Sequence, residues 1–456
     1  MKQRLPKPSQ MYWAARTAGY VAAQRRVPYL KPEQLRRLCD ARARSMVDHA
    51  WRTVPFYRRA MQERGLEPRH FHGVSDLGLL PVVHGRDLAD RPEHFLSSAY
   101  TPDNTLELLT SGSTGHSKRI HWDKAAVFQA HAAGLRHREV LAGFTGQRSG
   151  YRLLMVNSAG STNSDVREFH QRHSWVPTVV DPQTVYVSPR EPFEQAVQAI
   201  NAHRPEVVRG FGAYLGAIYR WAWSGGYPIH LPKVICFGGE HMHEADRQLI
   251  ESVYGVPVIT SYQSCEAMRM AFQCKRGSGL HISADQTHIR VAGPDGHTLP
   301  DGETGRVLMS NLVNRATVLL NYDLGDRGAM SPEFCDCGRT LPMLERLEGR
   351  DNDFVILPGG QVAHGSAVLS QLYRVPGLLR LQFIQHSHRE LEVKVVCNDD
   401  VDWNEMQRGL DKALTRALGP HSFAVTWRRV KRIEPGPGGK YKCMISRVRP
   451  DTPPGR

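Results

Sequence analysis

Short apolar runs that end in glycine- or serine-rich turns constrain the fold of this chain most strongly. Leu106–Leu109 leads into a loop of Gly, Ser and Thr, and residues 234–237 lead directly into Gly238, Gly239 and Glu240. Helical spacing occurs at residues 35–51, a pattern that Pro55 ends, and at residues 123–141, with Asp123 as the candidate cap. It occurs again at residues 193–202 and 213–224, and residues 256–261 predict another short strand. This alternation predicts a layered α/β body. Glycine at strand ends is where such folds bind ligands, outside the carboxyl edge of the sheet.

The loop after residue 109 has few side-chain atoms that would keep a ligand away. Its backbone N–H groups and hydroxyls could close around phosphate oxygens, with Lys118 adding a cation at the rim. The spacing differs from that of the Walker loop, and a plain surface loop is the alternative. The candidate phosphate-binding residues are Thr110, Ser111, Gly112, Ser113, Thr114, Gly115 and Lys118.

Composition limits the class of protein. With 456 residues, of which 41% are hydrophobic, the chain can bury a large core and divide into two or more domains. No apolar run reaches the length of a membrane span, and the N-terminus lacks an apolar signal core, so we expect a cytoplasmic protein. Residues 1–35 predict a helix that docks on the protein's own body, with a membrane-surface role as the alternative.

The charge and the cysteines agree with this expectation. Eight cysteines are sparse for the length and indicate a reducing compartment. The net charge of +14 favours anionic ligands or an acidic carrier protein. Because no long Lys/Arg run or nucleic-acid-binding motif accompanies the charge, we expect no nucleic-acid partner.

A change in the pattern of predicted helices and strands after residue 349 indicates a second domain. Charged turn residues at 349–353 predict a linker, and the segment beyond it predicts a small α+β module of about a hundred residues. This module ends in a Gly/Pro-rich loop at residues 435–439 that carries Lys440. We therefore predict an N-terminal domain at residues 1–349 and a C-terminal domain at residues 350–456.

Several short segments follow one another along the chain: residues 54–57, 65–66 and 80–82, the loop at 110–115, and residues 237–240, 261–266, 321–326, 349–350 and 439–440. Taken in order, these segments resemble the adenylate-forming superfamily, in particular its phenylacetate–CoA ligase branch and CapK-like relatives. The resemblance covers nearly the whole chain and implies the adenylate-forming enzyme fold, with a large α/β body that binds ATP and the acyl group and a small mobile α+β domain.

The resemblance implies ATP-dependent activation of a carboxylic acid, aryl or otherwise apolar, to an acyl-adenylate. The acyl group would then pass to a thiol of CoA or of carrier-protein phosphopantetheine. Two alternatives stay open: amide formation with an amine acceptor, and a degenerate member that binds nucleotide without chemistry. Ser117, Cys265 and Asn352 depart from the family's pattern and motivate the second alternative.

The resemblance also implies roles for single residues. Lys440 would be the catalytic lysine of the adenylation step, Thr114 and Glu266 would lie on the Mg²⁺ side, and Asn352 would be the hinge. Asp326, assisted by Arg350, would hold the ribose hydroxyls. The other residues implied at the nucleotide are Gly238, Gly239, Glu240, Ser261 and Tyr262.

Two further groups of residues are candidates. Cys274, His281, Cys335 and Cys337 could supply the four ligands of a structural Zn²⁺, with free buried thiols as the alternative. Specificity for the acid is expected at residues 157–164 and at a second segment that would suit an aromatic or apolar acid. Packing is the alternative role for that second segment. It consists of Phe211, Gly212, Ala213 and Tyr214.

Overall fold

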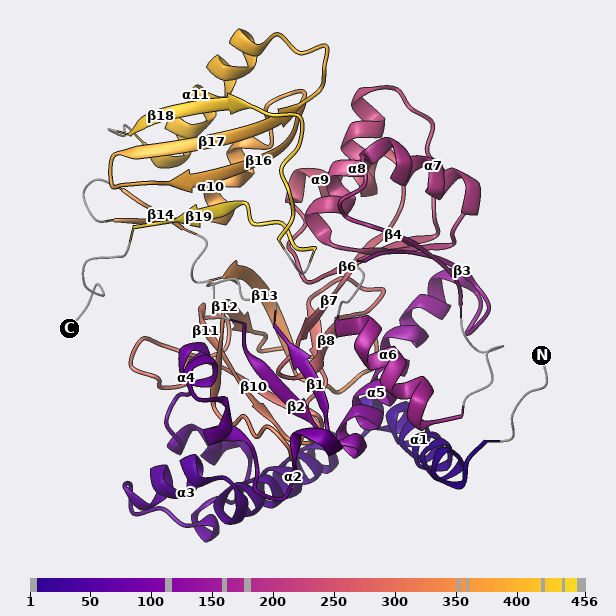
Figure 1. Ribbon diagram of the computed structural model, residues 1–456, viewed down its shortest axis with the longest axis vertical. Coiled ribbons are helices and arrows are strands. Elements are labelled where there is room, and N and C mark those ends of the chain that lie inside the picture. Colours follow the sequence, from indigo (N-terminus) through magenta and orange to yellow (C-terminus); the bar gives the residue numbers. More distant parts are fainter. Residues whose placement is uncertain are drawn as a thin grey trace. The chain divides into compact units, whose positions relative to one another are not determined.

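The computed structural model describes residues 6–110, 117–157, 162–175, 182–350, 354–357, 361–419, 423–436 and 439–448 (Figure 1). The chain divides into two compact units. The first unit comprises Met1–Tyr151, Ala159–Pro182 and Ile259–Leu347, and the second comprises Arg152–Ser158, Gln183–Val258 and Glu348–Arg456. These units do not follow the boundary expected after residue 349, which stays a prediction.

The first unit combines an N-terminal helical layer with β-strands. The helices are α1 (Pro8–Arg26), α2 (Pro32–Thr53), α3 (Pro55–Gln62), α4 (Gly85–Asp90), α5 (Lys124–Thr145) and α6 (Thr162–His173). The strands are β1 (Leu106–Leu109), β2 (Arg119–Trp122), β7 (Val258–Ser264), β8 (Met268–Gln273), β9 (Leu280–Ile282), β10 (Thr287–Ala292), β11 (Gly305–Asn311), β12 (Tyr322–Met330) and β13 (Met343–Arg350).

Local sequence explains where these helices begin and end. Pro55 cannot continue the hydrogen-bonding of α2, so α2 ends at Thr53 and α3 begins at the proline. Asp123 caps α5 as predicted, because its carboxylate accepts the Ala126 amide at 3.0 Å. The ring of Trp13 in α1 stacks on Phe128 of α5, with centroids 4.9 Å apart. The N-terminal helix therefore docks on its own unit, as expected.

The strands of the first unit follow the order β10-β11-β12-β13-β9-β8-β7, and β1 pairs with β2 in a separate hairpin. Antiparallel pairing joins β10 to β11, β11 to β12, and β9 to both β8 and β13. Strand β7 extends to Ser264, whereas the sequence predicted a strand that ends at residue 261. Tyr262 thus lies within a strand, and its neighbours Ser261 and Gln263 point to the opposite face.

The second unit contains a parallel layer in the order β6-β5-β3-β4. Its elements are β3 (Arg152–Val156), β4 (Gln183–Val187), α7 (Phe193–His203), β5 (Val207–Gly210), α8 (Gly212–Ser224), β6 (Val234–Gly238) and α9 (Glu244–Gln248). Buried aliphatic residues of β3, β5 and β6 pack against α7 and α8 in one core. The α/β class expected from the sequence is confirmed, although β4 itself was not predicted.

The C-terminal module belongs to the same unit (Figure 1, orange to yellow). Its four-stranded sheet has the order β18-β17-β16-β19, and a hairpin pairs β14 with β15. The α+β character is confirmed. Its elements are β14 (Phe354–Ile356), β15 (Val362–His364), α10 (Gly365–Leu372), β16 (Leu378–Gln385), β17 (Glu390–Cys397), α11 (Trp403–Leu418), β18 (Ala424–Arg429) and β19 (Met444–Ser446).

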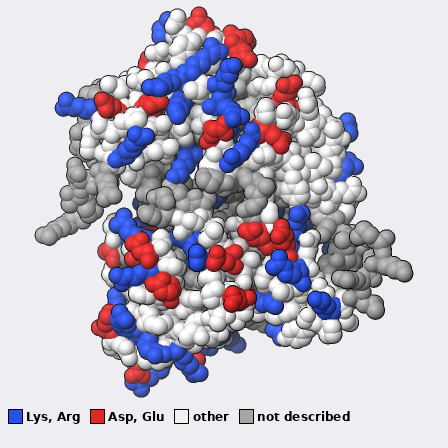
Figure 2. Space-filling view, viewed as in Figure 1, with Lys and Arg blue, Asp and Glu red and all other residues white. Residues whose placement is uncertain are grey.

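Two surface properties bear on possible partners. Among the described residues, no helix is both long and apolar enough to cross a membrane. Figure 2 shows Lys and Arg side chains spread over the visible face, with Asp and Glu among them. The positive net charge therefore does not by itself point to one site on this face.

Candidate functional site

A buried ion pair occupies the centre of the first unit's candidate site. Lys118, which precedes β2, donates from Nζ to Glu266 Oε1 at 2.5 Å and to the Tyr322 hydroxyl at 2.8 Å. The Tyr322 hydroxyl donates to the same carboxylate oxygen at 3.2 Å. The sequence predicted Lys118 and Glu266 for opposite partners, a phosphate and a metal ion. The structure brings the two side chains together.

The electrostatics of Glu266 follow from these contacts. Burial by itself raises the pKa of the carboxyl, but the Lys118 ammonium and the hydrogen bonds to Lys118 and Tyr322 outweigh it, so the pKa lies below its ordinary value. The backbone is fixed as well, because Asn311 donates to the Glu266 carbonyl at 3.0 Å. Glu266 is therefore an ionised carboxylate held in one orientation, which suits the binding of a cation.

A second carboxylate, Asp326, lies on β12. Its Oδ2 accepts the Tyr262 hydroxyl at 2.5 Å, which joins two residues that the sequence assigned to the nucleotide. On the same strand, Asp323 pairs with Arg306 at 3.3 Å and faces His84 at 3.5 Å. Two carboxylates thus project from one strand. Of the two, Asp326 is the one that is hydrogen-bonded to a residue of β7, Tyr262.

Several predicted residues cannot be placed in the site. Ser111, Gly112, Ser113, Thr114, Gly115 and Asn352 lie outside the described residues. Arg350 ends β13, but its side chain is not described. Thr110 is described: its hydroxyl accepts the Lys118 amide at 2.9 Å, and its own amide donates to the Lys118 carbonyl at 3.0 Å. The two ends of the loop are therefore held together at Thr110 and Lys118.

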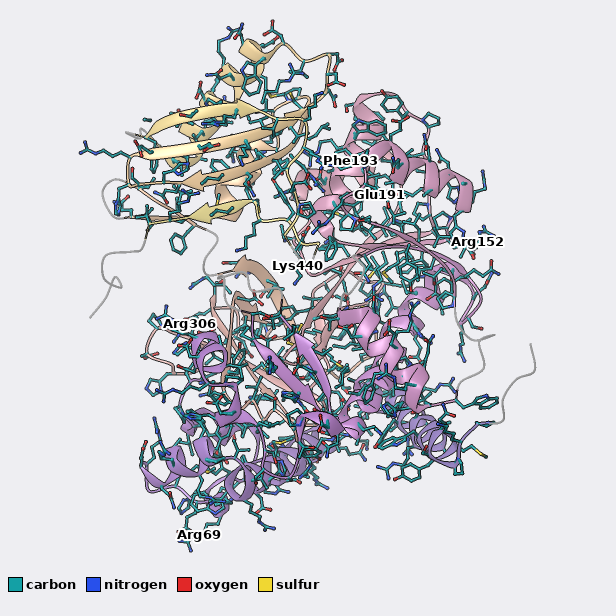
Figure 3. The ribbon with its side chains drawn as sticks, viewed as in Figure 1. Arg69, Arg152, Glu191, Phe193, Arg306 and Lys440 are labelled. Carbon is teal, nitrogen blue, oxygen red and sulfur yellow. The ribbon has the colours of Figure 1, made fainter. Side chains whose placement is uncertain are left out.

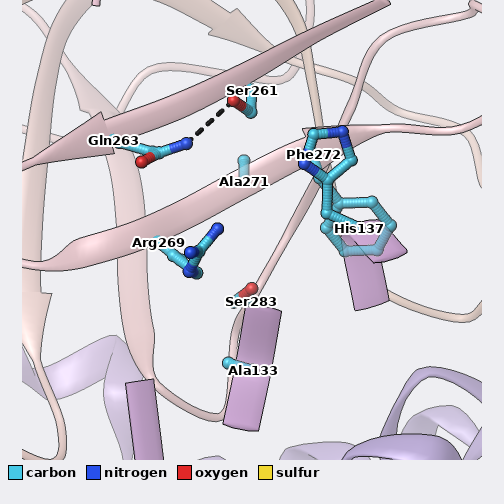
Figure 4. Close-up of a pocket in the computed structure, with 8 residues that line it drawn as sticks. All are labelled: Ala133, His137, Ser261, Gln263, Arg269, Ala271, Phe272 and Ser283. Carbon is cyan, nitrogen blue, oxygen red and sulfur yellow. Dashed lines mark hydrogen bonds between the residues drawn. The ribbon is translucent and has the colours of Figure 1, made fainter. Parts of the chain in front are cut away.

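Ser261 lines a small cavity (Figure 4). The Ser261 hydroxyl accepts a hydrogen bond from Gln263 Nε2 at 2.9 Å. The cavity lies between α5 and strands β7 and β8, on the face of β7 opposite to Tyr262. A nucleotide contact by the Ser261 side chain stays a prediction. The lining residues are Ala133, His137, Ser261, Gln263, Arg269, Ala271, Phe272 and Ser283.

In the second unit, Lys440 lies beside the glycine turn after β6 (Figure 3). Gly239 has a φ of +77°, a conformation that favours glycine. A Cβ built on Gly239 would be 3.5 Å from Lys440 Cε and 3.5 Å from the Phe211 ring. The carboxylate of Glu240, the next residue, accepts the Tyr441 amide. Four predicted residues, Phe211, Gly239, Glu240 and Lys440, therefore meet in one place.

The remaining residues of the expected acyl pocket have packing contacts. A Cβ on Gly212 would lie 2.6 Å from the Met242 amide nitrogen, so only glycine fits where α8 begins. Tyr214 is buried, and its hydroxyl donates to the Glu191 carbonyl at 3.1 Å. Ala213 packs against a small apolar cluster. Their part in an acyl pocket stays a prediction, as does that of residues 157–164, most of which are not described or belong to α6.

The four predicted metal ligands converge in the first unit. One ligand atom from each of Cys274, His281, Cys335 and Cys337 lies within 4.8 Å of all the others. Cys274 and Cys335 have their sulfurs 3.6 Å apart, too far for a disulfide, and Cys337 Sγ lies 3.4 Å from His281 Nε2. Tetrahedral Zn–S bonds of about 2.3 Å place sulfurs about 3.8 Å apart. Burial lowers the pKa of His281 to about 4, which keeps the imidazole neutral and able to ligate.

The loop that carries two of these cysteines also reaches the N-terminal segment. Arg339 donates to Cys337 Sγ at 3.4 Å, and its guanidinium lies 5.5 Å from the centre of the Tyr29 ring. The Thr340 amide donates to the Pro28 carbonyl at 2.9 Å. The cluster therefore joins the loop after β12 to the connection between α1 and α2.

Sequence reasoning missed two residues at these sites. Tyr322 lies inside the motif at residues 321–326, so that motif could have identified it. Arg380 of β16 lies in no motif. Its guanidinium lies 5.1 Å from each of the ring centres of Phe193, Tyr214 and Tyr441. Nothing in the sequence around an arginine in an apolar strand distinguishes it from a surface arginine.

Comparison with known proteins gives consistent matches. The family model described as the CapK C-terminal domain matches residues 359–447. A phenylacetate-coenzyme A ligase of Thermus thermophilus is 28% identical over 447 residues, covering 91% of this chain and 97% of that protein. The phenylacetate-coenzyme A ligase of Escherichia coli is 24% identical, covering 72% of this chain and 74% of that protein.

Solved structures with the same fold include a 2-hydroxyisobutyryl-CoA ligase in its postadenylation state, with a TM-score of 0.71. It is 16% identical and covers 92% of this chain and 91% of that chain. The anthranilate CoA ligase AuaEII has a TM-score of 0.54 at 14% identity, covering 80% of this chain and 73% of that chain. At these identities the structural matches concern the fold.

Proposed function

We propose that this chain is an AMP-forming acid–CoA ligase of the adenylate-forming superfamily, in the branch of the phenylacetate–CoA ligases and their CapK-like relatives. A carboxylate oxygen of the acid attacks the α-phosphorus of ATP, and the bond to the leaving pyrophosphate breaks. The CoA thiolate then attacks the acyl carbon of the adenylate, and AMP leaves. The two steps together consume ATP and release pyrophosphate and AMP.

The observation that carries the proposal is the position of Lys440 beside the glycine turn after β6. In the first step, negative charge develops on the α-phosphate. The Lys440 ammonium group would stabilise that charge, because it lies beside a turn whose backbone can approach a ligand. Lys118 and Glu266 supply a second cation and an ionised carboxylate. Mg²⁺, when bound, would neutralise the charge of the leaving phosphates, and Glu266 with Thr114 would hold it.

For the nucleotide we propose contacts with several of the predicted residues. Asp326 can accept hydrogen bonds from both ribose hydroxyls, and its bond from Tyr262 orients the carboxylate. Arg350 would assist it. Gly238 and Gly239 leave the turn without side chains, so an adenine ring could lie against the backbone.

For the acid we propose an aryl or other apolar carboxylic acid, since Phe211 contributes an aromatic surface next to Lys440. Coenzyme A is the acceptor that we favour. Carrier-protein phosphopantetheine and an amine are the alternative acceptors, and a member that only binds nucleotide is the alternative without chemistry.

The experiment that tests the function measures ATP-dependent pyrophosphate release by the purified protein with a panel of aryl and aliphatic acids, first without CoA. We expect release to be stimulated by one acid class, and CoA to give the corresponding thioester. Amide formation without thioester would favour the amine acceptor. ATP binding without pyrophosphate release from any acid of the panel would favour the alternative without chemistry.

We also propose that Cys274, His281, Cys335 and Cys337 hold a structural Zn²⁺. Three thiolates and one imidazole are a donor set that zinc binds tetrahedrally, with no position left for a substrate. The described positions fit this ion, because the four ligand atoms already lie within 4.8 Å of one another. The ion would fasten the loop after β12 to β9 and to the turn after β8.

Replacing Cys335 with serine is expected to remove the zinc and to lower the melting temperature, because metal binding contributes to folding. Elemental analysis and thermal unfolding measure the two effects. Cys443→Ser is the matched control, since Cys443 is a half-buried cysteine of the second unit, and it should keep its zinc. Wild-type protein without zinc, and unaffected by chelators, would leave the free-thiol alternative.

A further inference from the structure

We propose that Glu240 is a positioning residue for Lys440, because its carboxylate accepts the Tyr441 amide and thereby holds the Lys440 backbone against the turn after β6. The sequence placed Glu240 with the nucleotide. In the structure its carboxylate is directed instead to the loop that carries Lys440. The inference rests on the proposed function, since Lys440 is the residue that we assign to adenylation.

The backbone of Lys440 is held on both sides. The Lys440 carbonyl accepts the Gly436 amide at 2.8 Å, and the Gly439 amide donates to the Gly436 carbonyl at 2.9 Å. These bonds join Gly436, Gly439 and Lys440 to one another, but they do not attach the loop to another element. The bond from the Tyr441 amide to Glu240 attaches it to the segment after β6. It lies one residue from Lys440, where a small displacement would move the ammonium.

The side chain of Tyr441 reinforces this attachment. Its ring is buried, and its hydroxyl donates to the Leu381 carbonyl of β16. The Arg380 guanidinium lies 5.1 Å from the Tyr441 ring and equally far from Phe193 of α7 and Tyr214 of α8. Arg380 therefore contacts aromatic rings of the parallel layer and of the Lys440 loop together.

The carboxylate of Glu240 has an unusual environment. Among the described residues, its buried Oε2 has no hydrogen-bond partner, and neither has Nε of the buried Arg380. A buried carboxylate with an unused oxygen is costly, so a function should account for its presence. Holding the Tyr441 amide requires only one acceptor oxygen. A neutral glutamine would supply the same acceptor, which gives a direct test.

The test compares Glu240→Ala, Glu240→Gln and Glu434→Gln in the full-length protein. Glu434 is the control, since it is an exposed glutamate of the segment that leads to Lys440. With an acid that supports pyrophosphate release, we expect Glu240→Ala to lower kcat of adenylation by about 100-fold, the scale of a misplaced catalytic group, with KM for ATP little changed. Glu240→Gln should restore most of the kcat. Equal losses in Ala and Gln, or none in Ala, would overturn the proposal.

Hydrogen exchange of the Tyr441 amide gives a readout that needs no activity. We expect slow exchange in wild type and in Glu240→Gln, and fast exchange in Glu240→Ala, while amides of β16 and β17 stay protected as a check of folding. Unchanged exchange in Glu240→Ala would contradict the proposal even if no substrate is known. Conversely, exchange as expected in a protein that releases no pyrophosphate would count against the proposed function and not against this attachment.

The pH dependence of that exchange adds a second test. Burial raises the pKa of Glu240 to about 7, against the opposing effects of the Tyr441 amide, Arg380 and Lys440. An exposed glutamate has an ordinary pKa of 4.5, so between pH 4.5 and about 7 the attached loop holds a proton that a detached, exposed Glu240 would release. Protection of the Tyr441 amide, corrected for intrinsic exchange, should therefore fall as pH rises from about 4.5 to about 7 in wild type and stay level at higher pH. It should stay constant in Glu240→Gln.

Discussion

Replacing Lys440 with alanine is expected to reduce ATP-dependent pyrophosphate release by about 100-fold or more, the range seen when one preorganised donor to a developing charge is removed. The Lys440 side chain lies against Gly239 and does not contribute to a hydrophobic cluster, so the fold should tolerate its loss. ATP affinity should change by no more than about threefold, or less than 1 kcal/mol. Pyrophosphate release and equilibrium ATP binding measure the two quantities.

Lys431→Ala is the matched control, because Lys431 is an exposed lysine of the strand-to-loop segment that precedes Lys440. It should leave both quantities unchanged. Undiminished pyrophosphate release by Lys440→Ala would show that this lysine is not the catalytic lysine of adenylation. A large loss of ATP affinity would instead mean that Lys440 binds the ground state of the nucleotide.

Glu266→Gln is expected to have two effects. Without an ionised carboxylate, pyrophosphate release should fall by about 100-fold, with a weaker dependence on Mg²⁺. Lys118 would also lose its charge partner while its side chain is only 20% exposed. We expect a loss of about 2 kcal/mol in the free energy of unfolding, below the range of about 3–5 kcal/mol for fully buried pairs. Denaturant unfolding and metal titration of the activity measure these effects.

The pH dependence of the free energy of unfolding tests whether the ion pair explains the effect of Glu266→Gln. The pKa of Glu266 is lowered in the folded protein, so its ionised form contributes stability at pH above its ordinary value of 4.5. That contribution is lost as pH falls through the folded-state pKa, so wild type and Glu266→Gln should converge in stability at acid pH. Glu107→Gln, which removes a half-exposed partner of Arg119, should cost little at any pH. A stability gap independent of pH would refute the ion pair as its cause.

Sequence patterns predicted correctly those features that depend on residues close together in the chain. The helix at residues 213–224, the cap at Asp123 and the break at Pro55 depend on neighbours in the chain, and they are confirmed. The four candidate metal ligands were grouped by their residue types, with free buried thiols as the alternative, and the fold brings their ligand atoms within 4.8 Å of one another.

Pairings between distant side chains could not be predicted in the same way. Lys118 was assigned to a phosphate and Glu266 to Mg²⁺, and nothing in the sequence indicates that residues 148 positions apart bind each other. Glu240 was assigned to the nucleotide because it follows the glycine turn, although its carboxylate direction depends on a loop two hundred residues later. The position of Arg380 at this site is evident only from its contacts with three aromatic rings, which come from three different segments of the chain.

The contact of the cysteine loop with the N-terminal segment bears on how the chain is made. The Thr340 hydroxyl reaches the Pro28 carbonyl across 312 positions, and Arg339 covers Tyr29. During synthesis, the connection after α1 is exposed for most of translation, since its partners emerge after three quarters of the chain. We expect the connection after α1 to remain accessible to chaperones until residue 340 has left the ribosome.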